Sequence, residues 1–362
     1  MENLEIMDLF GNLFKDKKVF ITGDTGFKGS WLCIWLNALG AEVYGYSLPP
    51  KTKRDNFIKS NVAEIIHHVD GDVRDGAKFK KILAEAKPDI ALHLAAQSLV
   101  LPSYAAPAET FETNIIGTVN FFEAVRQTPS VKVAVNITSD KCYQNNEWIW
   151  GYRESDPMGG NDPYSASKGC SELITGSYLK SFFSTGDCVI ASARAGNVIG
   201  GGDWVEHRIV PDIFRAYFSN QNLVVRNPHA TRPWQFVLEP LFGYLRLTEM
   251  LYQKGRSYSG GWNFGPVAGK EHSVNDVIQT MKLTIPELKF VADQNTGNPH
   301  EATLLKLDIS KALAHLGWKP LLNFDETISL TAEGYLVETD NQDVYRHRLS
   351  QIKKYAEKIL NK

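Results

Sequence analysis

The sequence predicts an α/β protein with a doubly wound parallel sheet and a smaller mixed C-terminal lobe. Three observations support this class. Short apolar runs alternate with helical segments over the first part of the chain. A glycine-rich turn at 23–29 joins the first apolar run to the first helix. Beyond residue 205 the alternation becomes irregular, which indicates a change of architecture.

The composition of the 362-residue chain is that of an ordinary globular protein, with 43% hydrophobic and 22% charged residues. Its formal net charge of -2 gives no reason to expect nucleic acid or a membrane surface as a partner. The four scattered cysteines form no C-x-x-C pair, so neither a metal site nor a disulfide framework is predicted. The N-terminus lacks a signal-peptide pattern, and no apolar run reaches the roughly 20 residues of a membrane span. We therefore expect a cytoplasmic protein.

The expected elements follow one another in βαβ order. Strands are predicted at 17–22, 42–46, 65–69, 89–97, 131–137 and 187–193, and helices at 30–39, 79–87, 109–126 and 165–184. A further helix opens at Arg208. The apolar segment at 261–266 resembles one more short strand, so the chain is expected to rejoin the sheet there. No long linker follows residue 205, which favours a lobe packed over the sheet edge.

The turn between the first strand and the first helix carries the sequence Gly-x-x-Gly-x-x-Gly. Glycines at a strand-to-helix turn let the backbone approach a pyrophosphate, whose charge the helix N-terminus favours. This placement predicts a Rossmann-like dinucleotide site. Its candidate residues are Gly23, Thr25, Gly26, Phe27, Lys28 and Gly29.

The choice between NAD and NADP stays open on the residues. An acidic residue is expected about 20 positions after the turn when the site binds the ribose 2'-hydroxyl of NAD. The second strand ends at Tyr46-Ser47-Leu48-Pro49-Pro50 with no acid. Lys51, Lys53 and Arg54 follow, and they suit either a 2'-phosphate or a solvated loop.

Later strand ends supply further candidate cofactor residues. Asp72 and Val73 follow the third strand, where a carboxylate can reach an adenine amino group; a plain turn is the alternative. Small residues Ala95 and Ala96 end the fourth strand and would let the backbone lie against a cofactor. Asn114 lies on the following helix, and Tyr164 and Lys168 further along the chain are also candidate cofactor residues. His93 sits within an apolar strand and is predicted to be a core histidine.

Two segments carry the predicted chemistry. Ser139, Asp140 and Lys141 come directly after an apolar strand, and ligands in such sheets lie beyond the strand C-termini. Tyr164 and Lys168 are four positions apart at a helix start, so they share one helical face. A nearby ammonium is expected to lower the pKa of the Tyr164 phenol and make it a base for an alcohol. A surface Tyr-Lys pair on an ordinary helix is the alternative, which the upstream glycine turn makes less favourable.

The chain resembles the extended short-chain dehydrogenase/reductase family, and within it the CDP-glucose 4,6-dehydratases. Motifs that carry the resemblance are Thr-Gly-Asp-Thr-Gly-Phe-Lys-Gly-Ser-Trp-Leu at 22–32, His-Leu-Ala-Ala-Gln at 93–97, Asn-Ile-Thr-Ser-Asp-Lys-Cys-Tyr at 136–143, Trp-Gly-Tyr-Arg-Glu at 150–154, Pro-Met-Gly-Gly at 157–160, Asp-Pro-Tyr-Ser-Ala-Ser-Lys at 162–168, Arg-Ala-Gly-Asn-Val-Ile-Gly-Gly-Gly-Asp-Trp at 194–204, Arg-Pro-Trp-Gln at 232–235, Pro-His-Glu-Ala at 299–302 and Leu-Gly-Trp at 316–318. The resemblance covers roughly 17–320. It implies a dinucleotide-binding domain at 1–205, rejoined near 261–266, and a substrate-binding lobe at 206–362.

The resemblance also implies a lyase reaction: dehydration of a nucleotide sugar to a 4-keto-6-deoxy sugar, with NAD used catalytically. Tyr164, Lys168 and Ser139 would serve oxidation at C4, Asp140 the departure of water and Lys141 the removal of the C5 proton. Relatives acting on dTDP-glucose place Asp-Glu where this chain has Asp140-Lys141, so the base here would be a lysine.

Substrate contacts are implied for Gln97, Asn197, Arg208 and Arg232. The two arginines suit a diphosphate through bidentate contacts, and solvent-exposed arginines are the alternative. A homodimer or higher homo-oligomer that pairs through helices 109–126 and 165–184 is the default by resemblance. A nucleotide-sugar 4-epimerase or 4-ketoreductase, and a non-catalytic NAD(P)-binding protein, remain the alternatives in function.

Overall fold

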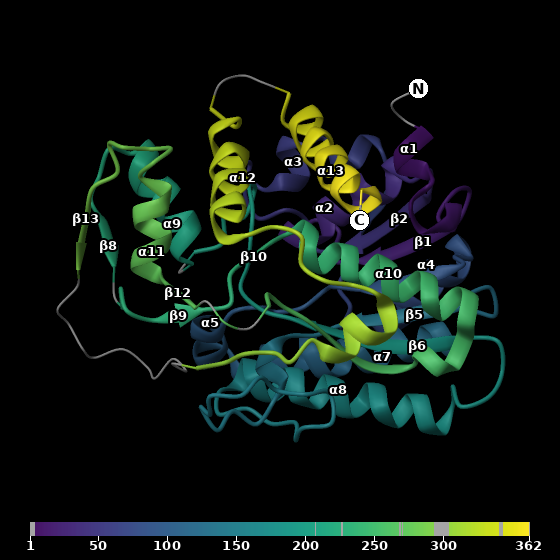
Figure 1. Ribbon diagram of the computed structural model, residues 1–362. Coiled ribbons are helices and arrows are strands. Elements are labelled where there is room, and N and C mark those ends of the chain that lie inside the picture. The colour runs from purple at the N-terminus through teal and green to yellow at the C-terminus, as the bar shows by residue number, and fades with distance from the viewer. Residues whose placement is uncertain are drawn as a thin grey trace.

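Seven parallel strands form the centre of the protein, seen in a computed structural model (Figure 1). The structure describes residues 4–206, 208–225, 227–267, 269, 271–292, 304–339 and 343–361. The strands are β1 Lys18–Thr22, β2 Glu42–Ser47, β3 His67–Asp70, β4 Ile90–His93, β5 Val133–Ile137, β6 Val189–Ala195 and β11 Gly260–Phe264. Their order across the sheet is β11-β6-β5-β4-β1-β2-β3.

The chain reverses its direction of travel across the sheet between β1 and β4. These two strands are neighbours, with Thr22 opposite His93 at their carboxyl ends. Strands on one side continue toward β3 and those on the other toward β11. Such a switch point is where open α/β sheets bind ligands. The fold is therefore the predicted doubly wound, Rossmann-like sheet.

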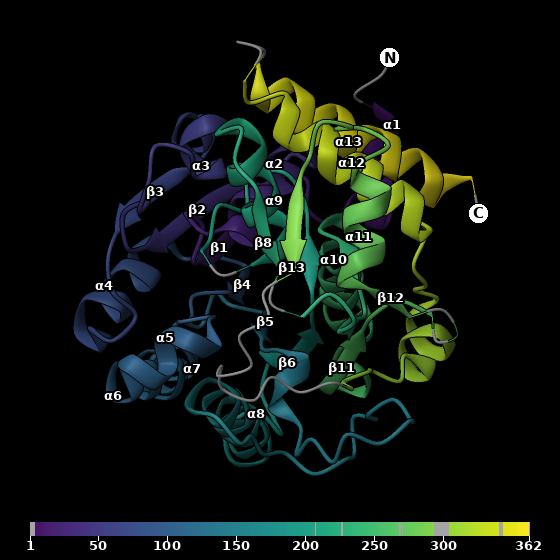
Figure 2. The ribbon, with the colours of Figure 1, turned by 90° about the vertical axis from the view of Figure 1, so that its left-hand side faces the viewer.

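Helices cover both faces of this sheet (Figure 1, Figure 2). One core packs the sheet against α2 Phe27–Ala38, α10 Leu238–Lys254 and α13 Val344–Leu360. The opposite core packs it against α4 Gly76–Ala86, α7 Gly117–Arg126 and α8 Pro163–Ser181. The remaining helices near the sheet are the short α1 Leu4–Met7, α3 Asn56–Lys59, α5 Val100–Ala105 and α6 Pro107–Phe111.

Several predicted boundaries differ from the observed ones. The first helix begins at Phe27, three residues earlier than expected, because the chain turns into it directly at Gly26. The expected helix at 109–126 is divided by a π-helical turn at Glu112–Ile116. The fourth strand ends at His93, because the amides of Leu94 and Ala95 donate to the Thr22 hydroxyl.

The C-terminal lobe has its own hydrophobic core, which lies to the left in Figure 1. It contains α9 Ile209–Phe218, α11 Val274–Met281, α12 Phe324–Leu336 and the parallel pair β8 Leu223–Val225 with β13 Phe290–Ala292. Two small pairs connect it to the sheet: β7 Val198–Ile199 with β10 Gln235–Phe236, and β9 Thr231–Arg232 with β12 His272–Ser273. In the described part of the chain, no helix has the length and apolar character to cross a bilayer.

Not all of the segment after residue 205 lies in this lobe. The strand expected at 261–266 is β11, which pairs with β6 at the sheet edge. Helices α10 and α13 also pack in the main core and not in the lobe core. The boundary between 1–205 and 206–362 therefore stays a sequence prediction, and the Pro-His-Glu-Ala motif at 299–302 lies outside the described residues.

Replacing Arg348 by methionine is expected to destabilise the protein by about 3–5 kcal/mol. Arg348 is fully buried on α13 and donates to Glu338, to the Gly334 carbonyl and to Asn56, at 2.8, 2.7 and 3.0 Å. The substitution leaves the Glu338 carboxylate without its cation. Urea unfolding would measure the loss. Arg346→Met is the control, because its side chain is 84% exposed and its ion pair contributes at most about 1 kcal/mol.

Candidate active site

The loop after β5 carries the predicted catalytic residues. Ser139 caps the short 3-10 turn Asp140–Cys142, and its hydroxyl accepts a hydrogen bond from the Lys141 amide at 3.2 Å. The same hydroxyl donates to Oδ1 of Asp140 at 2.9 Å. The turn places the Asp140 side chain inside the protein, where the residue is 3% exposed.

The second carboxylate oxygen of Asp140 has no hydrogen-bond partner within the described residues, although it is buried. It lies against the backbone of Gly196, where an added Cβ would come within 1.9 Å of it. A buried polar atom without a partner is costly, and it is typical of sites that expect a ligand or water.

Tyr164 and Lys168 lie in the first turns of α8. Asp162 caps the helix by accepting from the Ser165 amide at 2.9 Å, and Ser103 on α5 accepts from the Tyr164 amide at 3.2 Å. Tyr164 is 7% and Lys168 5% exposed. The alternative of a surface Tyr-Lys pair is therefore wrong.

The expected lowering of the Tyr164 pKa is also wrong. The pKa of Tyr164 is raised to about 12, mainly by burial and also by the Asp140 charge, whereas a hydrogen bond with Ser139 and the Arg208 charge oppose the increase. Burial lowers the pKa of Lys168 to about 8. Desolvation is the largest cause of both shifts, because burial removes water from each group.

A second lysine reaches the same centre from the glycine turn. Lys28 Nζ donates to the Tyr244 hydroxyl on α10 at 3.3 Å. The pKa of Lys28 is lowered to about 7, mainly by desolvation and also by the charges of Lys168 and Arg208, whereas the charge of Asp140 opposes the decrease. These couplings place Lys28, Lys168 and Arg208 around one centre with Asp140.

The glycine turn is as tight as its sequence predicts. Gly23 has a φ of +78°, and an added Cβ would lie 2.7 Å from the Ala95 amide nitrogen. A Cβ at Gly29 would lie 2.0 Å from the Gly23 carbonyl oxygen. Gly26 precedes α2 without a side-chain cap, so the first amides of that helix remain available to an anion. Phe27 and Lys28 provide these amides.

The predicted ribose and adenine regions hold polar groups with partners. Thr25 shares a 2.9 Å hydrogen bond with Ser47 at the end of β2, and no acid follows that strand. The Asp72 carboxylate accepts from Arg74 Nε at 2.8 Å, which holds the pKa of Asp72 below its usual range. Val73 is buried. Contacts of these residues with a cofactor stay predictions.

Gln97 and Asn114 stabilise the loop after β4 through their side-chain hydrogen bonds. The side-chain nitrogen of Asn114 donates to the backbone carbonyl of Gln97 and to the Ser167 hydroxyl on α8, at 2.9 and 2.8 Å. Its side-chain oxygen accepts from the backbone amide of Gln97. The Gln97 side chain binds Leu99 and Thr110. Both side chains thus hold the loop containing Ala96, and their direct ligand contacts stay predictions.

The other predicted substrate residues are distributed over the sheet edge and the lobe. Arg208 Nη1 pairs with Asp203 at 2.8 Å, and its charge acts on Tyr164 and Lys28. Asn197 has a φ of +49° in the loop after β6. Arg232 lies on β9 and donates to the Thr231 carbonyl at 2.8 Å. Among the predicted substrate residues, Arg208 is the one whose charge acts on Tyr164.

His93 is a core residue, as predicted. It is 2% exposed, hydrogen-bonds Thr22 at 2.7 Å and stacks on Phe121. Burial lowers its pKa to about 3, so it is neutral. The sequence analysis missed Tyr244, because no pattern around it on α10 indicates a place in the site. It also missed Glu172, although its position four residues after Lys168 places both on one face of α8.

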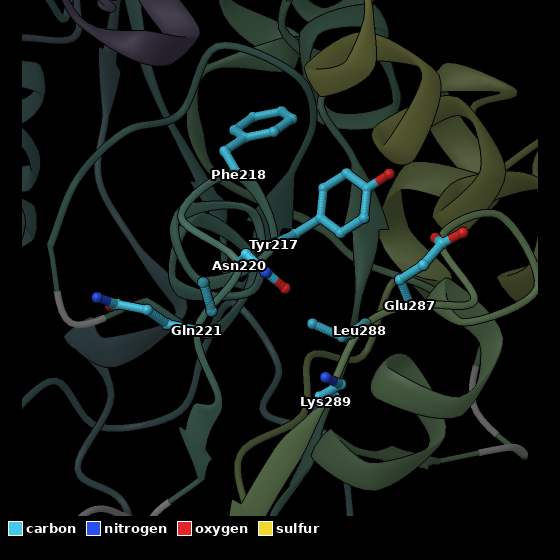
Figure 3. Close-up of a pocket in the computed structure, with 8 residues that line it drawn as sticks. Tyr217, Phe218, Asn220, Gln221, Glu287, Leu288 and Lys289 are labelled. Atoms are coloured by element: carbon cyan, nitrogen blue, oxygen red, sulfur yellow. The ribbon is translucent and has the colours of Figure 1, made fainter.

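The hollow with a volume of about 340 Å³ in Figure 3 lies elsewhere, on the lobe. Tyr217, Phe218, Asn220 and Gln221 line it from the end of α9, and Glu287, Leu288 and Lys289 from the segment before β13. None of the predicted catalytic or cofactor residues lines this hollow.

The parallel sheet, the glycine turn and the buried Tyr164-Lys168 pair define a Rossmann-like protein with a dinucleotide-type site. Residues 20–331 match the GDP-mannose 4,6 dehydratase family, and the chain belongs to this family. It is 47% identical over 323 residues to the CDP-glucose 4,6-dehydratase of Salmonella typhimurium. The alignment covers 88% of this chain and 90% of that protein.

More distant proteins share the same architecture. A dTDP-glucose 4,6-dehydratase of Xanthomonas campestris pv. campestris is 26% identical, over 87% of this chain and 92% of that protein. The solved structure of a Bacillus anthracis dTDP-glucose 4,6-dehydratase in complex with NAD has a TM-score of 0.71 at 19% identity, covering 90% of this chain and 98% of that one. An epimerase of Methanothermobacter thermautotrophicus reaches a TM-score of 0.76 at 24% identity, covering 96% and 97%.

Proposed function

We propose that this protein is a lyase that dehydrates CDP-glucose to CDP-4-keto-6-deoxyglucose with NAD as a catalytic cofactor. The observation that carries the proposal is the buried Asp140, whose free oxygen lies in the same centre as Ser139 and Tyr164. An acid at this place is needed for expelling a hydroxyl group. The 47% identity to the Salmonella CDP-glucose 4,6-dehydratase supports both the reaction and the choice of nucleotide.

The residues fit NAD. The cradle formed by Gly23 and Gly29 has no room for side chains, and the uncapped start of α2 offers amides to a pyrophosphate. Thr25 and Ser47 present hydroxyl groups where the ribose is expected. When bound, NAD would accept the hydride from C4 of the sugar and return it to C6.

Tyr164 is the proposed base for the first step. Its phenolate oxygen, hydrogen-bonded to Ser139, takes the proton of the C4 hydroxyl as that carbon is oxidised. The phenol has a raised pKa, so its deprotonation depends on positive charge close to it. Arg208 acts on the phenol in this sense, and Lys168, in the next turn of α8, is proposed to do the same.

Lys141 and Asp140 are proposed for the elimination. The C4 ketone acidifies the C5 hydrogen, and Lys141 removes this proton. Asp140, in its protonated form, donates through its free oxygen to the C6 hydroxyl, which departs as water. Addition of hydride at C6 and a proton at C5 then completes the product, so the reaction has no net redox change.

A mass-spectrometric assay tests the proposal. Purified protein is incubated with NAD and either CDP-glucose or dTDP-glucose, and the sugar nucleotide is weighed. Loss of one water from CDP-glucose alone is the expected result. Retention of both substrates, with NAD bound to the protein, would contradict the dehydratase and favour the epimerase or 4-ketoreductase, which do not need an acid-base pair at 140–141.

Replacing Gly29 by alanine is expected to weaken NAD binding by more than about tenfold, or 1.4 kcal/mol. The new Cβ would collide with the Gly23 carbonyl and push α2 away from the turn. Calorimetry with NAD and with NADP would measure the change and the cofactor preference together. Gly176→Ala on α8 is the control, because open space surrounds that glycine. Equal NAD affinity in the two variants would contradict the assigned cradle.

A homodimer that pairs through the α6–α7 region and α8 is part of the proposal. Large apolar side chains are exposed there, including Leu173, Phe182 and Ile116 at 64%, 52% and 48%. We propose that these side chains are covered in the dimer. Leu173→Glu is expected to convert the dimer to a monomer in light scattering after gel filtration, whereas Leu283→Glu on the lobe is not. A monomeric wild-type protein would contradict the proposed dimer. The cytoplasmic location is a separate prediction.

A further inference from the structure

A buried carboxylate lies directly beneath the catalytic loop. Glu172 on α8 is 6% exposed. Its Oε1 accepts a hydrogen bond from the hydroxyl of Thr138, the residue before Ser139. Its Oε2 accepts from Ser192 at 2.7 Å and from Arg194 Nη2 at 2.8 Å, both on β6. One side chain of α8 thus holds the end of β5 and the neighbouring strand.

The partner of Glu172 holds the far end of the same loop. Arg194 Nη1 donates to the Tyr143 hydroxyl at 2.6 Å and to the Glu154 carbonyl at 3.2 Å. The Tyr143 hydroxyl in turn donates to Asn263 on β11 at 2.7 Å. The loop 138–143 is therefore fixed at both ends by a single buried ion pair, and Ser139, Asp140 and Lys141 lie between these ends.

Glu172 also lies one helical turn beyond Lys168 on the same face of α8. The groups that act electrostatically with Lys168 are Lys28 from the glycine turn, His93 from β4, Cys142 from the catalytic loop and Glu172. His93 is neutral, and burial raises the pKa of the Cys142 thiol well above its usual value, so it is neutral too. The Glu172 charge is the strongest influence that raises the pKa of Lys168 against desolvation.

We propose that Glu172, paired with Arg194, is a positioning residue for the reaction proposed above, which aligns the 138–143 loop with α8 and places its negative charge one helical turn from Lys168. Neither residue needs to touch the substrate for this role. Because the pair is buried and fully hydrogen-bonded on the Glu172 side, it keeps the acid, the hydroxyl and the tyrosine in fixed register. The inference rests on the proposed function, since it assigns a task within that site.

The test compares the pH dependence of kcat in three variants. Wild-type activity is expected to fall at alkaline pH as Lys168 loses its proton, near pH 8. Glu172→Gln removes the anion, so this alkaline limb is expected to move down by at least about one pH unit. Glu172→Asp restores the charge, and Ser192→Ala removes one hydrogen bond to the same carboxylate but leaves its charge, so both should keep the wild-type limb.

A purely structural role would reduce stability and kcat in all three variants without moving the limb, and that result would overturn the inference. If Glu172→Gln does not fold because Arg194 is left unpaired, the double variant Glu172→Gln with Arg194→Met removes both charges, and an unshifted limb there overturns it equally. NAD affinity should stay unchanged in every variant. Inactivity of the wild type on nucleotide sugars would instead refute the proposed function, so the two failures are distinguishable.

Discussion

Replacing Asp140 by asparagine is expected to stop the loss of water while sugar oxidation continues. Asparagine fills the same buried space but has no acidic proton to give the departing C6 hydroxyl. Formation of the dehydrated product should fall by about 10²–10⁴-fold, the range for a lost acid-base group. Because the oxidised sugar then cannot lose water, no C6 position becomes available to take the hydride back. Reduced nicotinamide should therefore accumulate in a single turnover. Its absorbance, with mass spectrometry of the sugar nucleotide, measures both effects.

Deuterium exchange separates Asp140 from its neighbour. In heavy water, Asp140→Asn should still exchange the C5 hydrogen of the oxidised sugar, because Lys141 is intact, whereas Lys141→Met should not. Asp187→Asn is the matched control, since this carboxylate is 86% exposed and should leave every step unchanged. Normal water loss in Asp140→Asn would make the Asp140-Lys141 pair structural and refute the assignment of the acid.

Replacing Tyr164 by phenylalanine is expected to prevent the reaction at its first step. The ring keeps its packing, but no group remains to take the C4 hydroxyl proton. We expect kcat to fall by about 10³-fold, with no transient reduced nicotinamide. This absence distinguishes the variant from Asp140→Asn, in which the reduced cofactor accumulates. Stopped-flow absorbance on the protein with NAD bound measures the step directly.

The control for Tyr164 lies on the same helix. Tyr178 also loses only a hydroxyl in Tyr178→Phe, and its partner is Glu123 on α7, away from the catalytic loop. This variant should react normally. Cofactor affinity of Tyr164→Phe should be close to that of the wild type, so a loss of activity explained by lost NAD binding would contradict the assignment.

Local sequence patterns were sufficient for the parts of the site that lie within a few residues of one another. The glycine turn could be predicted because a strand precedes it and a helix follows. At Gly23 and Gly29 neighbouring backbone atoms lie so close that only glycine fits. Spacing alone placed Tyr164 and Lys168 on one face of α8. The polar residues after β5 were readable because parallel strands end at one edge of the sheet.

Helix boundaries were less readable where packing overrides local preference. The segment predicted as one helix at 109–126 contains a π turn, next to which Asn114 reaches across to Gln97 and Ser167. No local sequence pattern indicates that the loop after β4 packs against Asn114. The same holds for α10 and α13, which follow the lobe in sequence but pack on the sheet.

Short-range sequence patterns are enough to predict the class of fold, the glycine turn and the candidate catalytic residues, because each follows from local backbone geometry. Which charged groups come together depends on the packing of the whole chain. It brings Lys28 and Tyr244 together from helices 216 residues apart, joins Glu172 to Arg194 beneath the loop, and raises the Tyr164 pKa where spacing predicted a decrease. Desolvation and long-range contacts depend on how the whole chain packs, and no local pattern encodes them.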